Sequence, residues 1–470
     1  MMMVRRVPLG LALLFCSYVY FVYICLYKKD VIDMNKTLYL RCFLWVASLL
    51  AANATLYGQE VKNYPSRVGY PTYWGQRYTQ FAALGTESTD IVMIGDDFMD
   101  RGIWNEFFDN HNIKNRGIAG DVISAMDYRL DDVIKGRPSH VFIYIGKRDI
   151  KLGVSPSAAA HSVMDVVKRI HDKARRTRVY VISILPEVNT SDDMLSKYTA
   201  FNEELKNAAQ ANDFTYIDIV PHLCDESRRL DAQYTYNTGT TLNGRGYYAV
   251  SKALEPYICK SKMVADDLKE DYNLRGFIKE RNSIIEYLPT RSDDILMIGN
   301  SITNIGEWSE FIPYAHMRNR GISSDMTSGV LERLPHLLEV SPRAVFLMIG
   351  INDLGAGKDK DYVVSNILKI VSEIKRLSPR TAIYVESILP VNPTFTVFKT
   401  HTDQSESVRY VNSLLEKEAS RAGYVFINLH HRMCDRDGYL SAKYTNDGLH
   451  LCWEGYRLWR DILTSYIPRQ

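Results

Sequence analysis

Four short polar blocks in the second half of the chain hold the side chains that acyl transfer needs. Ser301 follows Gly299 and Asn300 after the apolar run "ILMI". Asn352 lies in "GIND" after another apolar run, and "DGLH" carries Asp447 and His450. A serine hydroxyl becomes a nucleophile when a histidine takes its proton and a carboxylate orients that histidine. Ser301, His450 and Asp447 are therefore the predicted nucleophile, base and orienting acid.

The same reaction needs hydrogen-bond donors where negative charge develops on the substrate oxygen. The predicted donors are the backbone N–H of Ser301, the backbone N–H of Gly321 in "NRG", and the side-chain amide of Asn352. A glycine at 321 is expected because a side chain there would block the approach of substrate to the backbone. Each block alone is a common turn sequence, so the prediction rests on their order and spacing.

The segments that precede these blocks predict the fold. Residues 295–299, 344–350, 382–389 and 424–429 are nearly continuous apolar runs, which is typical of strands buried on both faces of a parallel sheet. Between them, residues 361–377 repeat apolar side chains at three- and four-residue steps, as a helix covering a sheet does. This alternation predicts a three-layer, doubly wound α/β domain, with ligands bound beyond the carboxyl ends of the strands.

The domain is present twice. Gly95 corresponds to Gly299 at a shift of 204 residues, and the "NRG" that begins at Asn115 corresponds to the one that begins at Asn319. A repeat unit of about 200 residues indicates a tandem duplication of a whole domain rather than a solenoid. We expect an N-terminal region over 1–58, a first copy over 59–265 and a second copy over 266–470, with the two copies packed together.

The first copy lacks the catalytic set. Asp97 stands in the place of the serine, Arg148 in the place of the asparagine, and Thr238 and Thr241 in the places of the acid and the histidine. A carboxylate without a base is a poor nucleophile, and we expect Asp97 to form a salt bridge with Arg148 across the site. The hypothesis is an inactive copy that stabilises the second copy, shapes its cleft or binds glycan.

Over residues from about 275 to 470, the second copy resembles the SGNH (GDSL-type) hydrolases, whose four blocks are named for Ser, Gly, Asn and His. Asn300 departs from the commoner "GDS" opening. The phrases "NRGIS", "MIGINDL" and "YTNDGLHL" are similar to those of exported bacterial sialate and carbohydrate O-acetylesterases and of the platelet-activating-factor acetylhydrolase-like branch. The resemblance implies two tandem α/β/α domains with mainly parallel, flavodoxin-like sheets. It implies no metal or organic cofactor.

The loop over residues 391–407 is predicted to border the site. It combines polar side chains with Phe395 and Phe398, a mixture that favours a sugar over an alkyl chain, and its His401 is interpreted as a surface residue. We therefore expect a serine esterase that removes acetyl groups from carbohydrate. The alternatives are a lipid-directed acylhydrolase or thioesterase, and a non-catalytic glycan-binding protein of the cell envelope.

The N-terminus carries two apolar segments. Residues 7–27 form a charge-free run long enough to span a bilayer, which needs about 20 residues. Alternatively, translation begins at Met34, and the following segment is a signal peptide that ends in the small residues Ala52-Asn53-Ala54. Both interpretations predict export to the periplasm or envelope, the first with a membrane tether.

Composition and cysteine content limit the remaining functions. The formal net charge is +2 and no long basic run occurs, which argues against a nucleic-acid-binding face. No Cys/His cluster has zinc-binding spacing, so no structural metal is expected. Four cysteines follow the apolar segments: Cys224, Cys259, Cys434 and Cys452. In an exported protein they are expected to pair, most simply within each half, although the sequence leaves the pairing open.

Overall fold

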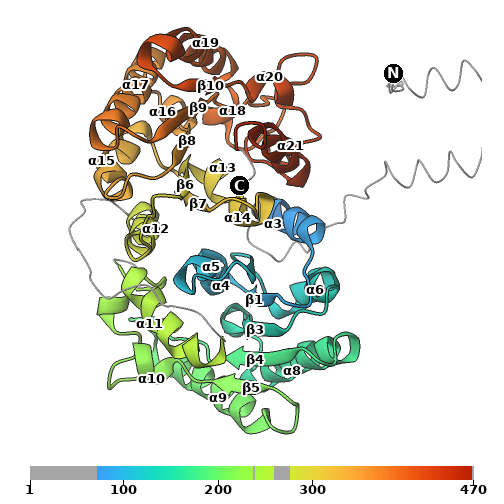
Figure 1. The fold of residues 1–470 in the computed structure, drawn as a ribbon. Helices are drawn as coiled ribbons and strands as arrows, with labels where there is room; N and C mark the ends of the chain where they lie inside the picture. Colours follow the sequence, from blue (N-terminus) through green and yellow to red (C-terminus); the bar gives the residue numbers. More distant parts are fainter. Residues whose placement is uncertain (1–70, 237–238, 259–275, 468–470) are drawn as a thin grey trace, which may run out of the picture. The chain divides into compact units, whose positions relative to one another are not determined.

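Two five-stranded sheets form the centres of the two copies in the computed structural model, which describes residues 71–236, 239–258 and 276–467 (Figure 1). The first sheet has the order β2-β1-β3-β4-β5 and the second the equivalent order β7-β6-β8-β9-β10, with every pairing parallel. This is the flavodoxin-like doubly wound order. The strands are β1 (Ile91–Gly95), β2 (Ile113–Gly117), β3 (His140–Tyr144), β4 (Arg178–Ile182), β5 (Thr215–Ile217), β6 (Ile295–Gly299), β7 (Met317–Gly321), β8 (Ala344–Met348), β9 (Ala382–Glu386) and β10 (Val425–Ile427).

Helices flank both sheets, so the predicted α/β/α architecture is confirmed for each copy. The α-helices associated with the first copy are α3 (Pro71–Leu84), α4 (Asp97–Arg101), α5 (Trp104–Phe107), α6 (Met126–Ile134), α7 (Lys147–Lys151), α8 (Pro156–Lys173), α9 (Asp192–Ala208), α10 (Val220–Leu223) and α11 (Gly244–Leu254). Those associated with the second are α12 (Gly276–Glu286), α13 (Ser301–Asn304), α14 (Trp308–Phe311), α15 (Thr327–Leu337), α16 (Ile351–Gly355), α17 (Lys360–Leu377), α18 (Lys399–Thr402), α19 (Ser405–Ala422), α20 (His430–Met433) and α21 (Trp453–Leu463).

The sequence pattern explains these elements. Strand β6 has the predicted bounds, and its Leu296, Met297 and Ile298 are fully buried because helices cover both faces of the sheet. Strand β8 ends two residues before the predicted run does, because Gly350 adopts a φ of +125° and turns the chain into α16. The helix predicted over 361–377 is α17, which is capped by the side chain of Asp359.

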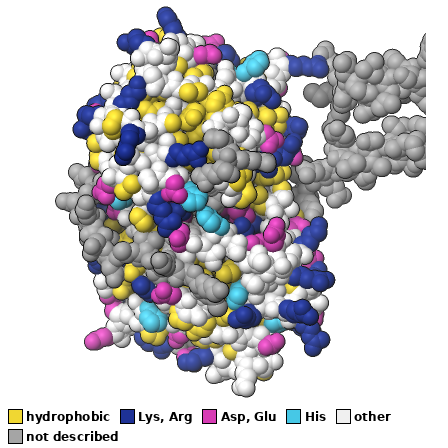
Figure 2. Space-filling view, viewed as in Figure 1, with side chains coloured by type: hydrophobic (Ala, Val, Ile, Leu, Met, Phe, Trp, Pro, Cys, Tyr) yellow, Lys and Arg dark blue, Asp and Glu magenta, His cyan; other side chains and the backbone are white. Residues whose placement is uncertain are grey.

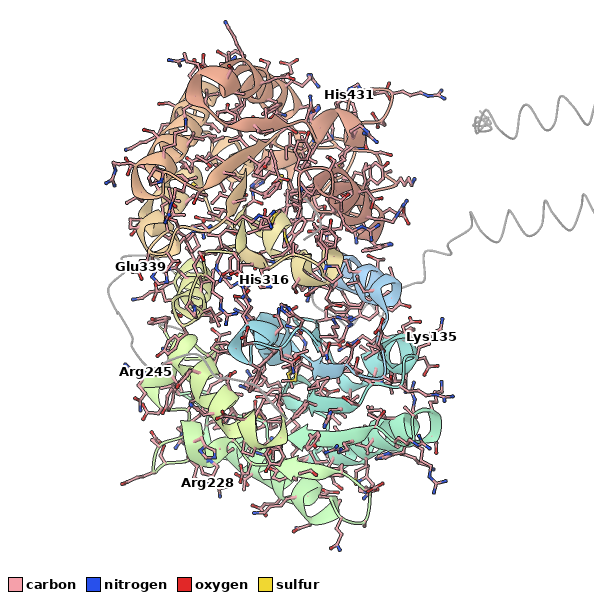
Figure 3. The ribbon with its side chains drawn as sticks, in the orientation of Figure 1. Lys135, Arg228, Arg245, His316, Glu339 and His431 are labelled. Atoms are coloured by element: carbon pink, nitrogen blue, oxygen red, sulfur yellow. The ribbon has the colours of Figure 1, made fainter. Side chains whose placement is uncertain are left out.

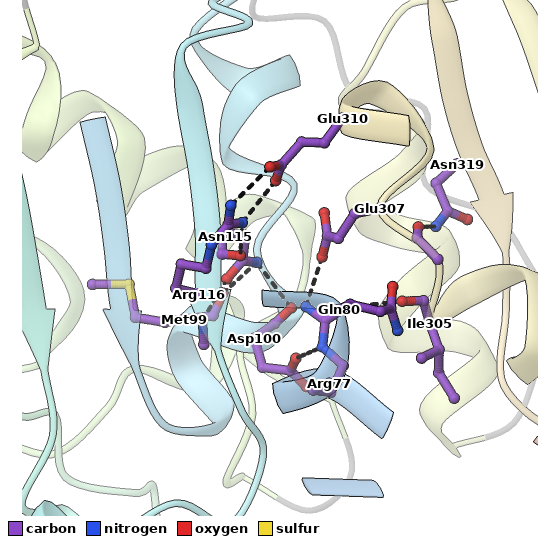
Figure 4. A network of polar contacts seen from close by, with 12 residues as sticks. Arg77, Gln80, Met99, Asp100, Asn115, Arg116, Ile305, Glu307, Glu310 and Asn319 are labelled. Carbon is purple, nitrogen blue, oxygen red and sulfur yellow. Dashed lines mark hydrogen bonds and ion pairs between the residues drawn. The ribbon is translucent and has the colours of Figure 1, made fainter. Parts of the chain in front are cut away.

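The two copies pack against each other through a pseudo-symmetric pair of ion pairs. The described residues of both copies belong to one compact unit. Within it, Arg116 makes a bidentate contact of 2.8 and 2.8 Å with Glu310, and Arg320 makes one of 3.1 and 2.9 Å with Glu106. Each residue of the first pair lies 204 positions from its counterpart in the second. Figure 4 shows the Arg116–Glu310 pair at this interface.

Two further contacts join the copies, and one of them links matching positions of the repeat. The Asn105 side-chain amide donates to the Ser309 hydroxyl over 3.3 Å, and these residues are also 204 positions apart. The ring of His316, labelled in Figure 3, lies 5.8 Å from the ring of His111. Figure 2 shows basic and acidic side chains intermixed over the visible face. The expected packing of the two copies is thus present in residues 71–467 where the structure describes them.

Several expectations fall outside the described residues. The apolar segment 7–27, the start at Met34, the cleavage site at 52–54 and Cys259 all lie there, as do the domain boundaries predicted at 58 and 265. No helix in the described part of the chain combines the length and apolar character needed to cross a membrane. The thiols of Cys224, Cys434 and Cys452 are free. The expected disulfide within the second half is therefore wrong, since both of its cysteines are described and unpaired.

Candidate active site

Ser301 is the first residue of helix α13, directly beyond the carboxyl end of β6. Asn300 caps this helix, because its Oδ1 accepts a hydrogen bond of 3.0 Å from Ile302 N–H. Asp96 performs the same capping in the first copy, where burial raises the pKa of its carboxyl to about 8. Asn300 departs from the "GDS" pattern but preserves the cap, with a side chain that does not ionise.

The structure brings Ser301, His450 and Asp447 together. Ser301 Oγ lies 3.0 Å from His450 Nε2, and His450 Nδ1 lies 2.8 Å from Asp447 Oδ2. A carboxylate only accepts hydrogen bonds, so this contact assigns the imidazole proton to Nδ1 and leaves Nε2 free to accept from the serine. The arrangement is that of a nucleophile, a general base and an orienting acid.

Asp447 is 1 % exposed, and its carboxylate is held by several donors. Its Oδ1 accepts from the backbone N–H groups of Leu449 and His450, over 2.9 and 2.8 Å. Burial raises the pKa of this carboxyl, but the hydrogen bond and charge of His450 and the two backbone donors lower it by more. The net pKa is below the ordinary value, so Asp447 is ionised near neutral pH and able to orient the imidazole.

Two of the three predicted oxyanion donors face the site. Ser301 is the first residue of its helix, where the backbone N–H has no intrahelical acceptor. Asn352, at the start of α16, donates one amide hydrogen to Asp325 O over 2.8 Å, which fixes the side chain and leaves the second hydrogen. Both residues line one cavity with His450.

The expectation for Gly321 needs correction. Its N–H donates to Asn319 Oδ1 over 3.0 Å, so it is not available to a substrate oxygen. A glycine is required there for a different reason: a Cβ at 321 would lie 2.4 Å from the backbone nitrogen of Asn304. Gly321 therefore allows the helix that carries Ser301 to lie directly against β7.

Ser324 occupies the place near the nucleophile that the sequence analysis gave to Gly321. It has a φ of +66°, lines the same cavity as Ser301, and donates its N–H to no acceptor among the described residues. Its counterpart in the first copy is Gly120, with a φ of +81°, whose N–H donates to Asp97 Oδ2 over 2.8 Å. Asp97 stands at the position of Ser301, so in the first copy this N–H contacts the side chain at that position.

The first copy retains a cavity but no catalytic set. Asp97 lies 3.9 Å from Arg101, and no ion pair joins it to Arg148 among the residues that the structure describes. The expected Asp97–Arg148 salt bridge is therefore wrong, because Arg101, one helical turn away, is the nearer cation. Asp97, Arg148 and Thr241 nevertheless line one cavity of about 280 Å³, which Arg101 also lines. Thr238 lies outside the described residues.

The loop after β9 borders the site, as expected. The exposed ring of Phe398 lies 5.1 Å from the ring of His450 in an edge-on contact. His401, in α18, lines the same cavity and is partly buried, so its interpretation as a plain surface residue is incomplete. Burial and the neighbouring His450 lower the pKa of His401, which favours its neutral form.

The cavity at Ser301 has a volume of about 640 Å³ and is lined by both copies. The first copy supplies charged side chains to its wall, among them Asp97, Arg101 and Arg77. Figure 4 shows Arg77 between Asp100 of its own copy and Glu307 of the second. A wall of this kind offers hydrogen bonds and charge to whatever occupies the cavity.

Sequence reasoning missed two residues that support the site. Asp325, fully buried and 3.0 Å from Arg333 Nε, supplies the carbonyl that fixes Asn352. Gln76, in α3, donates from Nε2 to Asp447 Oδ2 over 2.9 Å. Asp325 could have been found from the sequence, because it follows "NRGI" directly in "SSD". Gln76 could not, because it lies 371 positions before the residue that it contacts.

Comparison with known proteins identifies one family. The model of the GDSL-like lipase/acylhydrolase family matches residues 95–249 and again 297–458, one segment in each copy. A comparison with curated proteins finds no match.

Solved structures give similarities that each cover about two fifths of the chain. A protein from Streptococcus pneumonia assigned as a platelet activating factor is 29% identical, covers 41% of this chain and 91% of its own, and has a TM-score of 0.38. A GDSL-like lipase from Bacteroides thetaiotaomicron is 23% identical, with coverages of 37% and 88% and a TM-score of 0.34. Est24, a carbohydrate acetylesterase from Sinorhizobium meliloti, is 16% identical, with coverages of 37% and 97% and a TM-score of 0.31.

Proposed function

Since the chain belongs to the GDSL-like lipase/acylhydrolase family, we propose that it is a serine esterase that releases small acyl groups, above all acetyl, from carbohydrate hydroxyls. The observation that carries the proposal is the hydrogen-bonded series from Ser301 Oγ through His450 to Asp447. In the first copy, Asp97 and Thr241 stand at the positions of Ser301 and His450, so the reaction is assigned to the second copy alone.

The reaction begins with attack of Ser301 Oγ on the ester carbonyl carbon, while His450 Nε2 takes the serine proton. Negative charge moves to the carbonyl oxygen, which accepts from the backbone N–H of Ser301, the amide of Asn352 and the backbone N–H of Ser324. His450 then gives its proton to the departing alkoxide. Water attacks the acyl-serine with His450 as base, which releases the acid and restores Ser301.

Ser324 enters this scheme in place of Gly321 because of the internal repeat. Gly120 N–H contacts the side chain at the nucleophile position of the first copy, and Ser324 is its counterpart. A backbone donor needs no particular side chain, so a serine performs this role as a glycine would.

The preference for a carbohydrate acceptor rests on the cavity wall. Asp97, Arg101 and Glu280 line it beside Ser301, and none of them suits an alkyl chain, since covering charged side chains with hydrocarbon removes their hydration. Hydroxyl groups of a sugar both donate and accept hydrogen bonds, and they match such a wall. A lipid-directed acylhydrolase requires an apolar channel instead.

The test is acetate release by the full-length protein from acetylated sugars and p-nitrophenyl acetate, with p-nitrophenyl palmitate as the lipid-like comparison. Ser301→Ala removes the nucleophile, and Asp97→Ala changes the matching position of the first copy. We expect Ser301→Ala to abolish release, and Asp97→Ala to retain it. Activity that survives Ser301→Ala, or a wild type that cleaves no ester, would refute the proposal. Preference for the palmitate ester would refute its substrate class.

Export remains a proposal that rests on the N-terminal sequence alone. N-terminal sequencing of protein isolated from the native cells distinguishes its two forms. A start shortly after Ala54 supports cleavage of a signal peptide, and an intact start supports a membrane tether. Recovery of the protein from the cytoplasmic fraction contradicts both.

A further inference from the structure

The helices that lead into the two copies are exchanged between them. Helix α3 precedes the first copy, yet Thr79 on it accepts a hydrogen bond of 3.1 Å from Trp453 N–H, at the start of α21 in the second. Helix α12 precedes the second copy, yet Ser283 on it accepts one of 3.0 Å from Gly244 N–H, at the start of α11 in the first. Figure 1 shows α3 beside α21 and α12 beside α11. Each leading helix thus caps the last helix of the other copy.

This exchange brings one side chain of α3 to the catalytic acid. Gln76 is 1 % exposed, and its Nε2 donates to Asp447 Oδ2 and to Asn446 Oδ1, each over 2.9 Å. The orientation of the amide is fixed, because a carboxylate oxygen only accepts hydrogen bonds and must therefore face the NH₂ group. Asn446 in turn donates to Thr72 O over 2.9 Å, so both partners of Gln76 are themselves held.

Asp447 Oδ2 is the oxygen that also faces His450 Nδ1. Among the described residues, Gln76 and His450 are the two donors to this oxygen, whereas Oδ1 is held by its own loop. A second donor on Oδ2 restricts rotation of the carboxylate and stabilises its ionised form. Both effects keep the imidazole in the tautomer that accepts the Ser301 proton.

The residue at the matching position of α12 makes a different contact, so the contact between Gln76 and Asp447 occurs only at the second copy. Glu280 lies 204 positions after Gln76 and contacts Arg101 over 3.3 Å. An acidic side chain at 76 would instead face the Asp447 carboxylate and repel it. The two leading helices therefore carry side chains of different charge, each suited to the copy that it contacts.

We propose that Gln76 is a positioning residue for catalysis, through which the inactive first copy holds the Asp447–His450 pair of the second in its working geometry. The proposal rests on the esterase function and deepens it. In this role the first copy affects the rate of the chemical step. A first copy that only stabilised the second would not do so.

The test compares three full-length variants with the wild type. Gln76→Met keeps the length of the side chain and removes the donor, and Gln76→Glu keeps its shape and replaces the donor with a second carboxylate. Thr79→Val is the matched control, because it removes another contact of α3 with the second copy, three residues away, without touching Asp447. Each protein is assayed for kcat and KM on p-nitrophenyl acetate and for the rate of Ser301 labelling by a fluorophosphonate probe.

We expect Gln76→Met to lower kcat and the labelling rate by about tenfold or more, with KM changed by no more than about twofold, as for loss of a hydrogen bond to a charged group. Gln76→Glu is expected to lower both further near neutral pH, because the two carboxylates repel each other. In a proton NMR spectrum, the far-downfield signal of the His450 Nδ1 proton should shift or broaden in both variants. Thr79→Val should lower Tm while the labelling rate and that signal stay as in the wild type.

Two outcomes overturn the proposal. One is a Gln76→Met protein whose labelling rate and NMR signal equal those of the wild type. The other is a Thr79→Val protein that loses activity by the same factor, which would assign the effect to docking of α3. The probe reacts with an activated serine whatever the natural ester is. A wild type that is labelled but releases no acetate would therefore count against the esterase function, while the effect of Gln76 on labelling could still be measured. A wild type that neither labels nor cleaves overturns both.

Discussion

Replacement of Glu106 by glutamine tests whether the reciprocal ion pairs hold the two copies together. Glu106 is 6 % exposed and makes the bidentate contact with Arg320, which is fully buried. It also lies 3.8 Å from Arg318, and it is a counter-charge for Arg281, whose pKa burial lowers to about 10. The substitution keeps the size of the side chain and removes a negative charge that three buried cations share.

The magnitude follows from the burial of Arg320. Loss of one partner of a buried pair costs about 3–5 kcal/mol, because the other charge stays desolvated without compensation. The glutamine oxygen still accepts one hydrogen bond, so we expect the lower end, about 3 kcal/mol. At about 2–4 °C per kcal/mol for domains of 150–250 residues, Tm should fall by about 6–12 °C.

Thermal unfolding of the full-length protein, followed by circular dichroism, measures this change. Glu310→Gln is the pseudo-symmetric variant and should give a similar fall, since it leaves the buried Arg116 without its counter-charge. Glu373→Gln, which removes an exposed ion pair with Arg376, should leave Tm unchanged. The reasoning is refuted if both interface variants shift Tm by less than about 2 °C, or if Glu106→Gln and Arg320→Met have additive effects in the double variant.

Acid should weaken the same interface. Burial raises the pKa values of Glu106 and Glu310, but Arg320 and Arg116 lower them by more, so both stay below the ordinary range. Their contribution is full above the unfolded-state pKa of about 4.3 and is lost as pH falls through the lower folded value. The Tm difference between wild type and Glu106→Gln should therefore shrink below about pH 4, and a difference constant down to pH 3 would contradict the ion-pair account. Separately, Ser324→Gly should raise stability by about 0.5–1 kcal/mol in denaturant unfolding, because it relieves a positive φ. It should keep esterase activity, since the donor is a backbone N–H; loss of activity would show that the hydroxyl takes part.

The proximity of Ser301, His450 and Asp447 was predictable because local sequence determines where these residues lie. Ser301 and Asn352 each follow an apolar strand, and parallel strands present their carboxyl ends at one edge of the sheet. Asp447 and His450 share one short loop, so a hydrogen bond between them needs little beyond their spacing. The repeat also predicts the fold of the first copy. Its apolar strand segments match those of the second copy, although the side chains at the positions of Ser301 and His450 differ.

The predictions that were wrong concern which neighbour a residue contacts, and the spacing of residues in the sequence does not determine this. The sequence indicates that position 321 has no room for a side chain, and the prediction gives that space to the substrate. In the structure the space is taken by the backbone of α13, because this helix packs directly on β7. The Asp97–Arg148 pair was inferred from alignment, whereas Arg101 is closer through the helical repeat. Gln76 was invisible because nothing in the pattern of α3 indicates which copy the helix joins.

The exchanged helices bear on how such a protein can change by mutation. In a symmetric dimer of identical subunits, any substitution appears in both active sites at once. Joining two copies in one polypeptide removes that constraint, so Ser301 and Asp97 can diverge at matching positions while Gln76 and Glu280 adapt separately. The exchange also ties the copies together, because a gene encoding the second copy alone would lose the helix that contacts Asp447. Selection to retain the first copy is thus compatible with the absence of a serine and a histidine at its matching positions, which hold Asp97 and Thr241.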